Sequence, residues 1–416
     1  MLKSRFNIKN DDRICDVNCF LNEQTIIVKD ITNSLHNKKE RFINLSSIHK
    51  ITNTNKSFTI YYDNGKEISF YDQEFNVINE WLNAIHINIS SNSSQITEKS
   101  FNIIAEISRS KYSVIKLVEN KSTHKQYAMK IINKSLLSAQ NKIHTAMTER
   151  NILMQVNHPF IVNLYYSFQN TTNFYFVMEY MKSGDLFNCI KNSRRLRLED
   201  IKLYVAEIAL AIHYLHSLNI VYRDLKPENI MLTEDGHIKL IDFNLSKELT
   251  QKELFCHSFS GTIEYLAPEI VQKEKYGKEV DWWSLGILIF EMVFNRTPFK
   301  TRSQEKTLSK IAAAKFMIPD CGNIDLVNLI DGLLRKDPKK RFCYKDVMSH
   351  PFFHPLDFTD VLKKKYKPLN LPKQISITKA SQDLDHTQDL SSSIDQELIY
   401  IPDFYFDRSS KNLFHE

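Results

Sequence analysis

The stretch "YRDLKPENIML", residues 222–232, places a carboxylate, an ammonium group and a carboxamide within six positions of one another. Transfer of a phosphoryl group to a hydroxyl requires little covalent work from a protein. It requires a carboxylate that orients the hydroxyl and accepts its proton, a cation near the moving group, and oxygen ligands for magnesium. Asp224, Lys226 and Asn229 supply these three groups. The spacing therefore predicts a loop for phosphoryl transfer.

Three further polar residues extend the set of Asp224, Lys226 and Asn229: one follows the loop and two precede it. Asp242 in "IDFN" (241–244) would chelate magnesium that bridges phosphates. Lys130 ends the β-like run "YAMK", where it can pair with phosphate oxygens, and Glu149 in the amphipathic segment 141–156 is its natural partner. Taken singly, Lys–Glu pairs are mostly surface salt bridges and Asp-rich turns are mostly turns. Their occurrence together and in this order predicts an active site.

The motifs that follow point to one family. "GTIEYLAPE" at 261–269 and "DWWSLG" at 281–286 complete an order that resembles the eukaryotic protein kinase domain over residues 101–353. "YRD" in place of the more usual "HRD", together with a C-terminal tail, resembles the AGC group. The tail segments "HPFFHPLDFTDVLKKKYKP" (350–368) and "IPDFYF" (401–406) resemble those of protein kinase B and the serum-and-glucocorticoid kinases. The implied fold is α+β and bilobal: an N-lobe antiparallel sheet with one helix, a mostly helical C-lobe, and ATP between the lobes.

The N-terminal segment 1–88 has a different pattern. Apolar and polar residues alternate in short runs, and the Asn64-Gly65 step is a hairpin signal. A helical face follows that contains Phe75, Ile78, Trp81, Leu82 and Ile85. A sheet closed by one such helix resembles a pleckstrin-homology domain, a small β-sandwich or barrel. We therefore expect a pleckstrin-homology-like domain at 1–90, a linker at 91–100, the kinase domain at 101–353 and an AGC-kinase C-terminal tail at 354–416.

The kinase resemblance implies roles for individual residues. Asp224 would be the catalytic base, with Lys226, Lys130 and Glu149 as the other catalytic residues, and Asn229 and Asp242 would bind Mg²⁺. Met178 would be the gatekeeper of the ATP site, and Glu179 and Met181 would offer hinge backbone groups to adenine. Simple core packing is the alternative for the apolar residues that would sandwich the base, which are Ile107, Ile115, Ala128 and Met231.

Regulation and substrate choice are implied in the same way. Ser258 in "CHSFSGT" (256–262) is the expected phosphorylation site of an upstream kinase, and Arg223 would meet its phosphate; an unmodified loop serine is the alternative. Thr378 in "ISITKA" resembles the turn motif of the tail, although the proline that usually follows is absent. Carboxylates that would meet arginine upstream of a target serine or threonine, and so select protein substrates with basic motifs, are Asp185, Glu228 and Glu291.

The loop that would cover the phosphates departs from the family. Within "ISRSKYSVI" (107–115), Ser108, Ser110 and Ser113 occupy the three glycine positions. Serine adds a hydroxymethyl group that crowds phosphates, and it costs about 1 kcal/mol where φ must be positive. The backbone N–H groups that contact phosphate remain. We therefore expect reduced affinity for ATP, with binding retained.

Two other departures concern switching elements. Asn244 replaces the glycine of "DFG", and asparagine is the non-glycine residue that best tolerates a left-handed backbone. Tyr405 replaces the phosphorylatable residue of the tail motif, while Phe404 and Phe406 are still expected to dock on the N-lobe. A pseudokinase scaffold with weak nucleotide binding is therefore the alternative function. Pseudokinases more typically lose the active-site lysine or aspartates, which are present here, so an active enzyme ranks first.

Composition sets the remaining limits. The 416 residues are 42% hydrophobic and 25% charged, with a net charge of +6 that is too diffuse to indicate nucleic acid. Six scattered cysteines without a CxxC pair, and no apolar leader, indicate a cytoplasmic or nuclear protein. We expect this protein to be a monomer. Basic residues near the N-terminus, interrupted by acidic ones, leave open a phosphoinositide membrane contact or a protein-binding or autoinhibitory module; they are Lys3, Arg5, Lys9 and Arg13.

Overall fold

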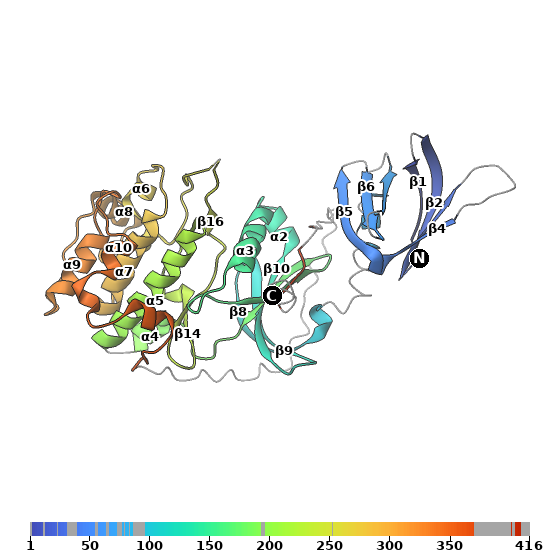
Figure 1. Ribbon diagram of the computed structural model, residues 1–416. Coiled ribbons are helices and arrows are strands. Elements are labelled where there is room, and N and C mark those ends of the chain that lie inside the picture. The colour runs from blue at the N-terminus through green and yellow to red at the C-terminus, as the bar shows by residue number, and fades with distance from the viewer. Residues whose placement is uncertain are drawn as a thin grey trace. The chain divides into compact units, whose positions relative to one another are not determined.

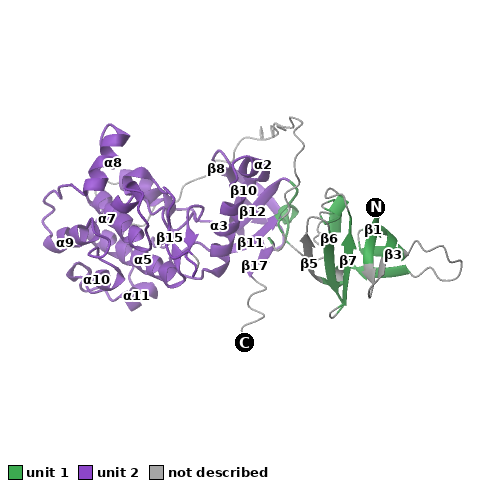
Figure 2. Cartoon of the chain, turned by 90° about the horizontal axis from the view of Figure 1, so that it is seen from above, with its two compact units in different colours: residues 1–100, 169–171, 390–404 green, residues 101–168, 172–389, 405–416 purple. Residues whose placement is uncertain are grey.

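The computed structural model (Figure 1) describes residues 2–10, 13–22, 24–30, 40–54, 57–63, 66–72, 77–78, 80–82, 84–85, 96–192, 196–251, 253–369, 401 and 404–408. The chain forms two compact units (Figure 2). The first contains Met1–Ser100, Gln169–Thr171 and Leu390–Phe404, and the second contains Phe101–Phe168, Thr172–Asp389 and Tyr405–Glu416. Within the described residues, the structure has no helix with the length and apolar character needed to span a membrane.

The first unit is built on a seven-stranded antiparallel sheet with the order β4-β3-β2-β1-β7-β6-β5. β1 pairs with β2 from Leu2↔Leu21 to Asn10↔Arg13 and with β7 at Asn7↔Tyr71 and Ile8↔Phe70. Helical residues follow at 77–78, 80–82 and 84–85. The elements are β1 (Leu2–Asn10), β2 (Arg13–Leu21), β3 (Thr25–Asp30), β4 (Glu40–Asn44), η1 (Leu45–Ser47), β5 (Ile48–Thr54), β6 (Ser57–Tyr62) and β7 (Lys66–Tyr71).

An aromatic cluster fills the core of this unit. Alternation along each strand turns every second side chain inward, so Phe6, Phe58 and Phe70 pack together in the core, and Phe6 meets the helical residue Trp81. The Phe6 ring lies edge-on to Trp81 at a centroid distance of 5.2 Å, and Phe58 stacks on Phe70 at 4.8 Å. The remaining members of the predicted helical face that the structure describes, Ile78, Leu82 and Ile85, are buried. Phe75 and the Asn64-Gly65 turn lie outside the described residues.

The second unit has an N-lobe and a C-lobe, as predicted. The N-lobe sheet has the order β17-β11-β12-β10-β9-β8. The sequence predicted one helix here, but a short helix precedes the expected one because the Asn133 side chain caps it by accepting from Leu136 N at 3.0 Å. η2 (Glu98–Ser100) precedes this lobe, at the end of the Met1–Ser100 segment of the first unit. The elements of the N-lobe are β8 (Phe101–Arg109), β9 (Ser113–Asn120), β10 (Gln126–Asn133), α2 (Lys134–Ser138), α3 (Ile143–Gln155), β11 (Leu164–Gln169), β12 (Asn173–Glu179) and β17 (Phe406–Asp407).

The C-lobe is mostly helical and is centred on two buried helices, α5 and α7. Gly286 in α7 permits close packing, since an added Cβ would lie 2.9 Å from the Leu333 Cβ in α9. The helices are α4 (Leu186–Asn192), α5 (Leu198–Ser217), η3 (Pro227–Asn229), η4 (Ile263–Tyr265), α6 (Pro268–Val271), α7 (Glu279–Phe294), α8 (Gln304–Ala313), α9 (Ile324–Leu333), α10 (Tyr344–Met348), η5 (Pro351–Phe353) and α11 (Phe358–Leu362). Two short strand pairs carry the loops of the site: β13 (Ile220–Val221) with β16 (Lys247–Glu248), and β14 (Ile230–Leu232) with β15 (Ile238–Leu240).

Candidate active site

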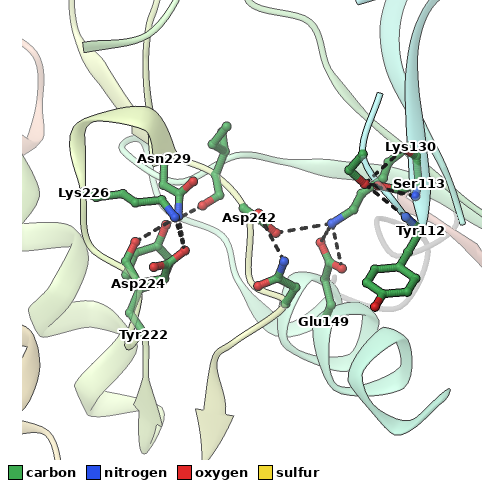
Figure 3. A network of polar contacts seen from close by, with 12 residues as sticks. Tyr112, Ser113, Lys130, Glu149, Tyr222, Asp224, Lys226, Asn229 and Asp242 are labelled. Atoms are coloured by element: carbon green, nitrogen blue, oxygen red, sulfur yellow. Dashed lines mark hydrogen bonds and ion pairs between the residues drawn. The ribbon is translucent and has the colours of Figure 1, made fainter. Parts of the chain in front are cut away.

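The loop between β13 and β14 gathers polar side chains around one carboxylate (Figure 3). Asp224 Oδ2 accepts hydrogen bonds from Lys226 Nζ at 2.8 Å and Asn229 Nδ2 at 2.7 Å. Its Oδ1 accepts from the Thr262 hydroxyl at 3.0 Å, and Lys226 Nζ also donates to that hydroxyl at 2.9 Å. Asp224 is 5% exposed. The loop therefore holds an oriented carboxyl group at the position predicted from the sequence.

A buried aspartate on α7 anchors this loop from beneath. Asp281 is fully buried and accepts from the backbone N–H groups of Tyr222 at 2.9 Å and Arg223 at 2.8 Å. Its Oδ2 also lies 2.8 Å from His216 Nε2 on α5. Arg223 adopts φ of 67°, a conformation that costs about 1–3 kcal/mol and is maintained only by surrounding contacts. The anchor therefore fixes the backbone next to Asp224.

A second polar group lies across the site and joins both lobes. Lys130 on β10 donates to Glu149 on α3 at 2.7 and 3.0 Å, and to Asp242 Oδ1 at 3.3 Å. Burial alone would lower the pKa of Lys130, but the neighbouring carboxylates Asp242 and Glu149 outweigh it and raise that pKa. The lysine is therefore charged at neutral pH. In Figure 3, Asp242 lies between this pair and the Asp224 loop.

Asn229 and Asp242 offer oxygen atoms that suit a magnesium ion. Asn229 uses its amide nitrogen to donate to Asp224, both to the carboxylate and to the backbone oxygen at 2.9 Å, which leaves the amide oxygen to serve as a ligand. Among the described residues, no cluster of three or more His, Cys, Asp or Glu side chains could hold a metal ion. Magnesium needs only one or two protein ligands where phosphates supply the others. The donor set therefore fits a magnesium–nucleotide complex.

Comparison with known proteins agrees with this geometry. The family model described as "Protein kinase domain" matches residues 101–353. The chain belongs to the protein kinase family. This family uses ATP as cosubstrate and Mg²⁺ as cofactor. The residue types and the two-lobed setting of the site are therefore those of a kinase.

Individual relatives indicate which group of protein kinases this chain resembles. Ribosomal protein S6 kinase alpha-2 of Mus musculus and its Homo sapiens counterpart are each 38% identical over 271 residues, which is 64% of this chain and 37% of theirs. Ribosomal protein S6 kinase alpha-6 of Danio rerio is 40% identical over 247 residues, 58% of this chain and 33% of the relative. The chain spans about a third of the length of these relatives. They belong to the AGC group, as predicted; the finer resemblance to protein kinase B stays a prediction.

The kinase's "DFN" motif contains no strained asparagine. φ is positive at Asp242, at 59°, whereas Asn244 is not among the described non-glycine residues with positive φ. The replacement of glycine therefore imposes no left-handed strain in this conformation. Instead, Asn244 Nδ2 donates to Asp242 Oδ2 at 3.3 Å, so the carboxylate predicted to bind metal is contacted by Lys130 on one oxygen and by Asn244 on the other.

The turn between β8 and β9 differs from expectation in two respects. Ser108, Ser110 and Ser113 are not among the described residues with positive φ, so the strain cost predicted for losing glycine does not arise. The Ser110 hydroxyl accepts from the N–H groups of Tyr112 at 3.4 Å and Ser113 at 3.1 Å. It also donates to the Ser113 carbonyl at 3.2 Å. Backbone donors that were expected to meet phosphate are therefore already bonded within the turn.

The predicted adenine-binding residues come from adjacent strands. Ala128 lies opposite the gatekeeper Met178, and Ile115 lies opposite Lys130. A bulge between Glu106 and Ser108 leaves Ile107 outside the regular register. The Glu179 side chain turns toward Lys239, at 2.5 Å, and its N–H donates to Asn163 O, so only its carbonyl can serve adenine. Met181 follows in the hinge, and Met231 lies on β14, where it forms a bridge with Asp185.

The activation segment brings Ser258 to the arginine of the catalytic loop. Arg223 Nη1 donates to Ser258 Oγ at 2.9 Å and to Tyr276 OH at 3.2 Å. Its Nε donates to the Leu245 carbonyl at 2.6 Å, immediately after "DFN". The predicted pair is therefore adjacent, and Arg223 links Ser258 to the segment that follows Asp242. Thr378, the other predicted phosphorylation site, lies outside the described residues.

The carboxylates predicted to bind substrate differ in their surroundings and contacts. Burial raises the pKa of Glu291, and the nearby carboxylates Glu228 and Glu264 raise it further, although the Tyr265 hydroxyl donates to it. Asp185 instead caps α4, since its Oδ1 accepts from Asn188 N at 2.7 Å. Glu264 and Thr262 are not among the residues that the sequence predicted for the site. Both lie in "GTIEYLAPE", the motif that resembles the family, and this position in the motif is the signal that could have indicated them.

Proposed function

We propose that the chain is an ATP- and Mg²⁺-dependent protein kinase that phosphorylates serine and threonine hydroxyls. The observation that carries the proposal is the pair of connected polar groups: Lys130 contacts Glu149 and Asp242, while Asp224 is held by Lys226 and Asn229. Each chemistry-bearing side chain is present and contacts its expected partner. The test is transfer of phosphate from ATP to a serine peptide with arginine upstream of the serine. The absence of transfer from the fully phosphorylated protein would contradict the proposal.

The geometry supports a division of labour. Asp224 would orient the substrate hydroxyl and accept its proton, because its carboxylate is fixed by three donors. Lys226, held between Asp224 and Thr262, would place a positive charge near the transferred phosphoryl group. Lys130 would pair with nucleotide phosphate oxygens. Asn229 and Asp242 would hold Mg²⁺, which when bound neutralises charge on the phosphates.

The pseudokinase alternative gains no support from the glycine replacements. The serines of the nucleotide-covering turn and Asn244 have ordinary backbone conformations. Inactivity would instead require a missing catalytic side chain or a broken contact, and Lys130, Glu149 and Asp242 are within hydrogen-bonding distance of one another. The structure therefore favours an enzyme whose nucleotide affinity is altered over a scaffold that has lost its chemistry.

Ser110 provides a test of that altered affinity. Ser110→Ala and Ser110→Gly both remove the hydroxyl that bonds to the N–H groups of Tyr112 and Ser113. Each neutral hydrogen bond contributes about 0.5–1.5 kcal/mol. We therefore expect both variants to lower the Kd for ATP about threefold to tenfold, measured by isothermal titration calorimetry with Mg²⁺.

The two Ser110 variants separate two explanations. Improvement in Ser110→Gly alone would show that backbone freedom or the bulk of the side chain limits affinity, and that competition by the hydroxyl does not. An unchanged Kd in both variants would show that the serine is no handicap. Ser122→Ala, in the turn between β9 and β10 of the same lobe, is the matched control and should leave the Kd unchanged.

We further propose that phosphorylation of Ser258 by an upstream kinase activates the enzyme. The support is its contact with Arg223, which also reaches the segment after Asp242. A phosphate here would form charge-assisted bonds with that guanidinium and order the activation segment. Ser258→Ala is expected to lower kcat about tenfold or more relative to the phosphorylated protein, measured by peptide phosphorylation after site occupancy has been determined by mass spectrometry.

Ser260 is the appropriate control for that variant. The Ser260 hydroxyl lies 2.9 Å from Ser258 Oγ, so it shares the surroundings of Ser258. Among the described residues, Arg223 donates to Ser258 and not to Ser260. Ser260→Ala should keep most of the activity. If phosphatase treatment that empties Ser258 leaves kcat unchanged, activation by this serine is wrong.

The acidic surface favours basic substrates. Burial raises the pKa of Glu291, and the negative charges of Glu228 and Glu264 nearby raise it further. Lys300 offsets part of this negative charge by pairing with Glu264 at 2.8 Å. An arginine upstream of the target hydroxyl would relieve this repulsion by adding a positive charge. We infer that Glu228 and Glu291 of the predicted set, together with Glu264, select such substrates, while Asp185 is engaged in capping α4.

For the first unit we propose a pleckstrin-homology type of fold. The support is its seven antiparallel strands in the order β4-β3-β2-β1-β7-β6-β5, with helical residues that bury Trp81. Arg5 pairs with Asp16, which reduces the positive charge this part of the sheet offers to an anionic lipid. A protein-binding role therefore fits this face of the sheet better than lipid recognition.

A further inference from the structure

The described end of the tail forms a strand at the edge of the N-lobe. β17 pairs antiparallel with β11, with Phe406 opposite Ser167 and Asp407 opposite Tyr166. Figure 2 labels β17 beside β11. The sequence predicted that Phe406 would dock on this lobe, and the mode of attachment is backbone pairing. Phe404 falls within the first unit. A strand attached in this way needs no phosphate for its main-chain hydrogen bonds.

Arg408, directly after β17, connects two elements of the N-lobe. Its guanidinium donates to Asn157 Oδ1 at 2.9 Å, to Leu164 O at 3.3 Å and to Val156 O at 3.5 Å. Val156 is the C-cap of α3, and Leu164 is the first residue of β11. A cation is favourable at a helix C-terminus, where backbone carbonyls lack partners within the helix. One side chain thus joins the end of α3 to the strand that receives the tail.

A second arginine contacts the tail from the middle of α3. Arg150 is 7% exposed, and its Nη2 donates to the Tyr405 carbonyl at 3.2 Å while its Nε donates to Ser167 Oγ at 3.3 Å. It follows Glu149 in sequence, and Glu149 lies 2.7 Å from Lys130. The helix that positions Glu149 is therefore attached to residues 405–408 at two places along its length.

We propose that Arg408 is a positioning residue, which clamps the tail strand and the end of α3 together and so keeps Glu149 on Lys130. The clamp consists of a guanidinium group on backbone and amide oxygens, and it works without a phosphate at position 405. This role deepens the proposed kinase function and depends on it for its effect on catalysis. Its effect on the helix is independent of whether the enzyme is active.

The test compares Arg408→Met with wild type in the full chain. Hydrogen–deuterium exchange, measured after phosphatase treatment and without nucleotide, should show faster exchange in α3 of the variant, with the C-lobe helix α5 unchanged as the internal reference. In peptide phosphorylation with ATP and phosphorylated Ser258, kcat should fall about tenfold or more while KM for the peptide stays constant, since misplacement of catalytic groups by about 1 Å is costly. Arg408→Lys, which keeps the charge, should regain part of the loss.

Each outcome decides one question. Unchanged exchange in α3 overturns the clamp, and so does equal acceleration in α3 and α5, which would mean general destabilisation. Faster exchange in α3 with unchanged kcat overturns its catalytic role. Faster exchange in α3 with no transfer even by phosphorylated wild type supports the clamp and contradicts the kinase function. Arg302→Met, at an exposed arginine before α8, controls for loss of charge and should match wild type in both measurements.

Discussion

Replacement of Asp224 by asparagine is expected to lower kcat for peptide phosphorylation by a factor of about 10³, within the range of general acid–base contributions. The amide keeps the shape of the side chain but cannot accept the proton of the substrate hydroxyl. In the variant, the asparagine amide also faces the ammonium of Lys226 and the amide of Asn229. In the wild type these two groups donate to the Asp224 carboxylate at 2.8 and 2.7 Å. Initial rates with saturating ATP and phosphorylated Ser258 measure the effect.

The binding of nucleotide should survive this change, because Asp224 lies in the loop between β13 and β14. Lys130, which would pair with the nucleotide phosphates, lies on β10 and is unaffected. The Kd for ATP should stay within about twofold of wild type, so a loss of both binding and turnover would indicate a misfolded loop. Asp331→Asn, at an exposed position on α9, is the matched control and should have wild-type kcat. A variant at position 224 that retains more than a tenth of wild-type kcat would contradict the assignment of the base.

The catalytic residues could be predicted because chemistry restricts both their types and their spacing. Asp224, Lys226 and Asn229 lie in one short loop, so their proximity follows from the chain itself. Lys130 and Asp242 are 112 positions apart, and only the known order of kinase motifs indicated that they meet. Where a family pattern existed, distant residues could be paired without a structure.

Other features could not be predicted, since they depend on local torsions or on contacts without a motif. The hydrogen bonds from the N–H groups of Tyr112 and Ser113 to the Ser110 hydroxyl require a particular turn geometry. The residue types alone indicated only that serine side chains would crowd the phosphates. The contact between Arg408 and Val156 spans 252 positions and involves a backbone oxygen, which leaves no trace in residue types. The positive φ at Asp242 instead of Asn244 is likewise a property of the folded loop.

Replacement of Arg341 by methionine is expected to destabilise the kinase unit by about 3–5 kcal/mol, the usual cost of removing one partner of a buried ion pair. Arg341 contacts Glu269 through two hydrogen bonds, at 2.7 and 2.9 Å, and the two side chains are only 1% and 4% exposed. It also donates to the Glu279 carbonyl at the start of α7. Methionine fills part of the volume but leaves Glu269 charged and unpaired. Urea unfolding followed by tryptophan fluorescence measures the loss, because Trp283 lies beside Arg341.

The double variant Arg341→Met, Glu269→Leu distinguishes burial of a lone charge from loss of packing. Because it removes both charges, it should recover a large part of the stability lost in Arg341→Met. Arg302→Met, which removes an exposed arginine, should shift the urea midpoint little, since most surface substitutions change stability by at most about 0.5 kcal/mol. A loss below about 1 kcal/mol in Arg341→Met would mean that water or another cation compensates Glu269. A double variant no more stable than Arg341→Met would assign the loss to the guanidinium's bonds with the backbone carbonyls of Glu279, Arg335 and Lys336, which join α7 and the end of α9 to the segment before α10.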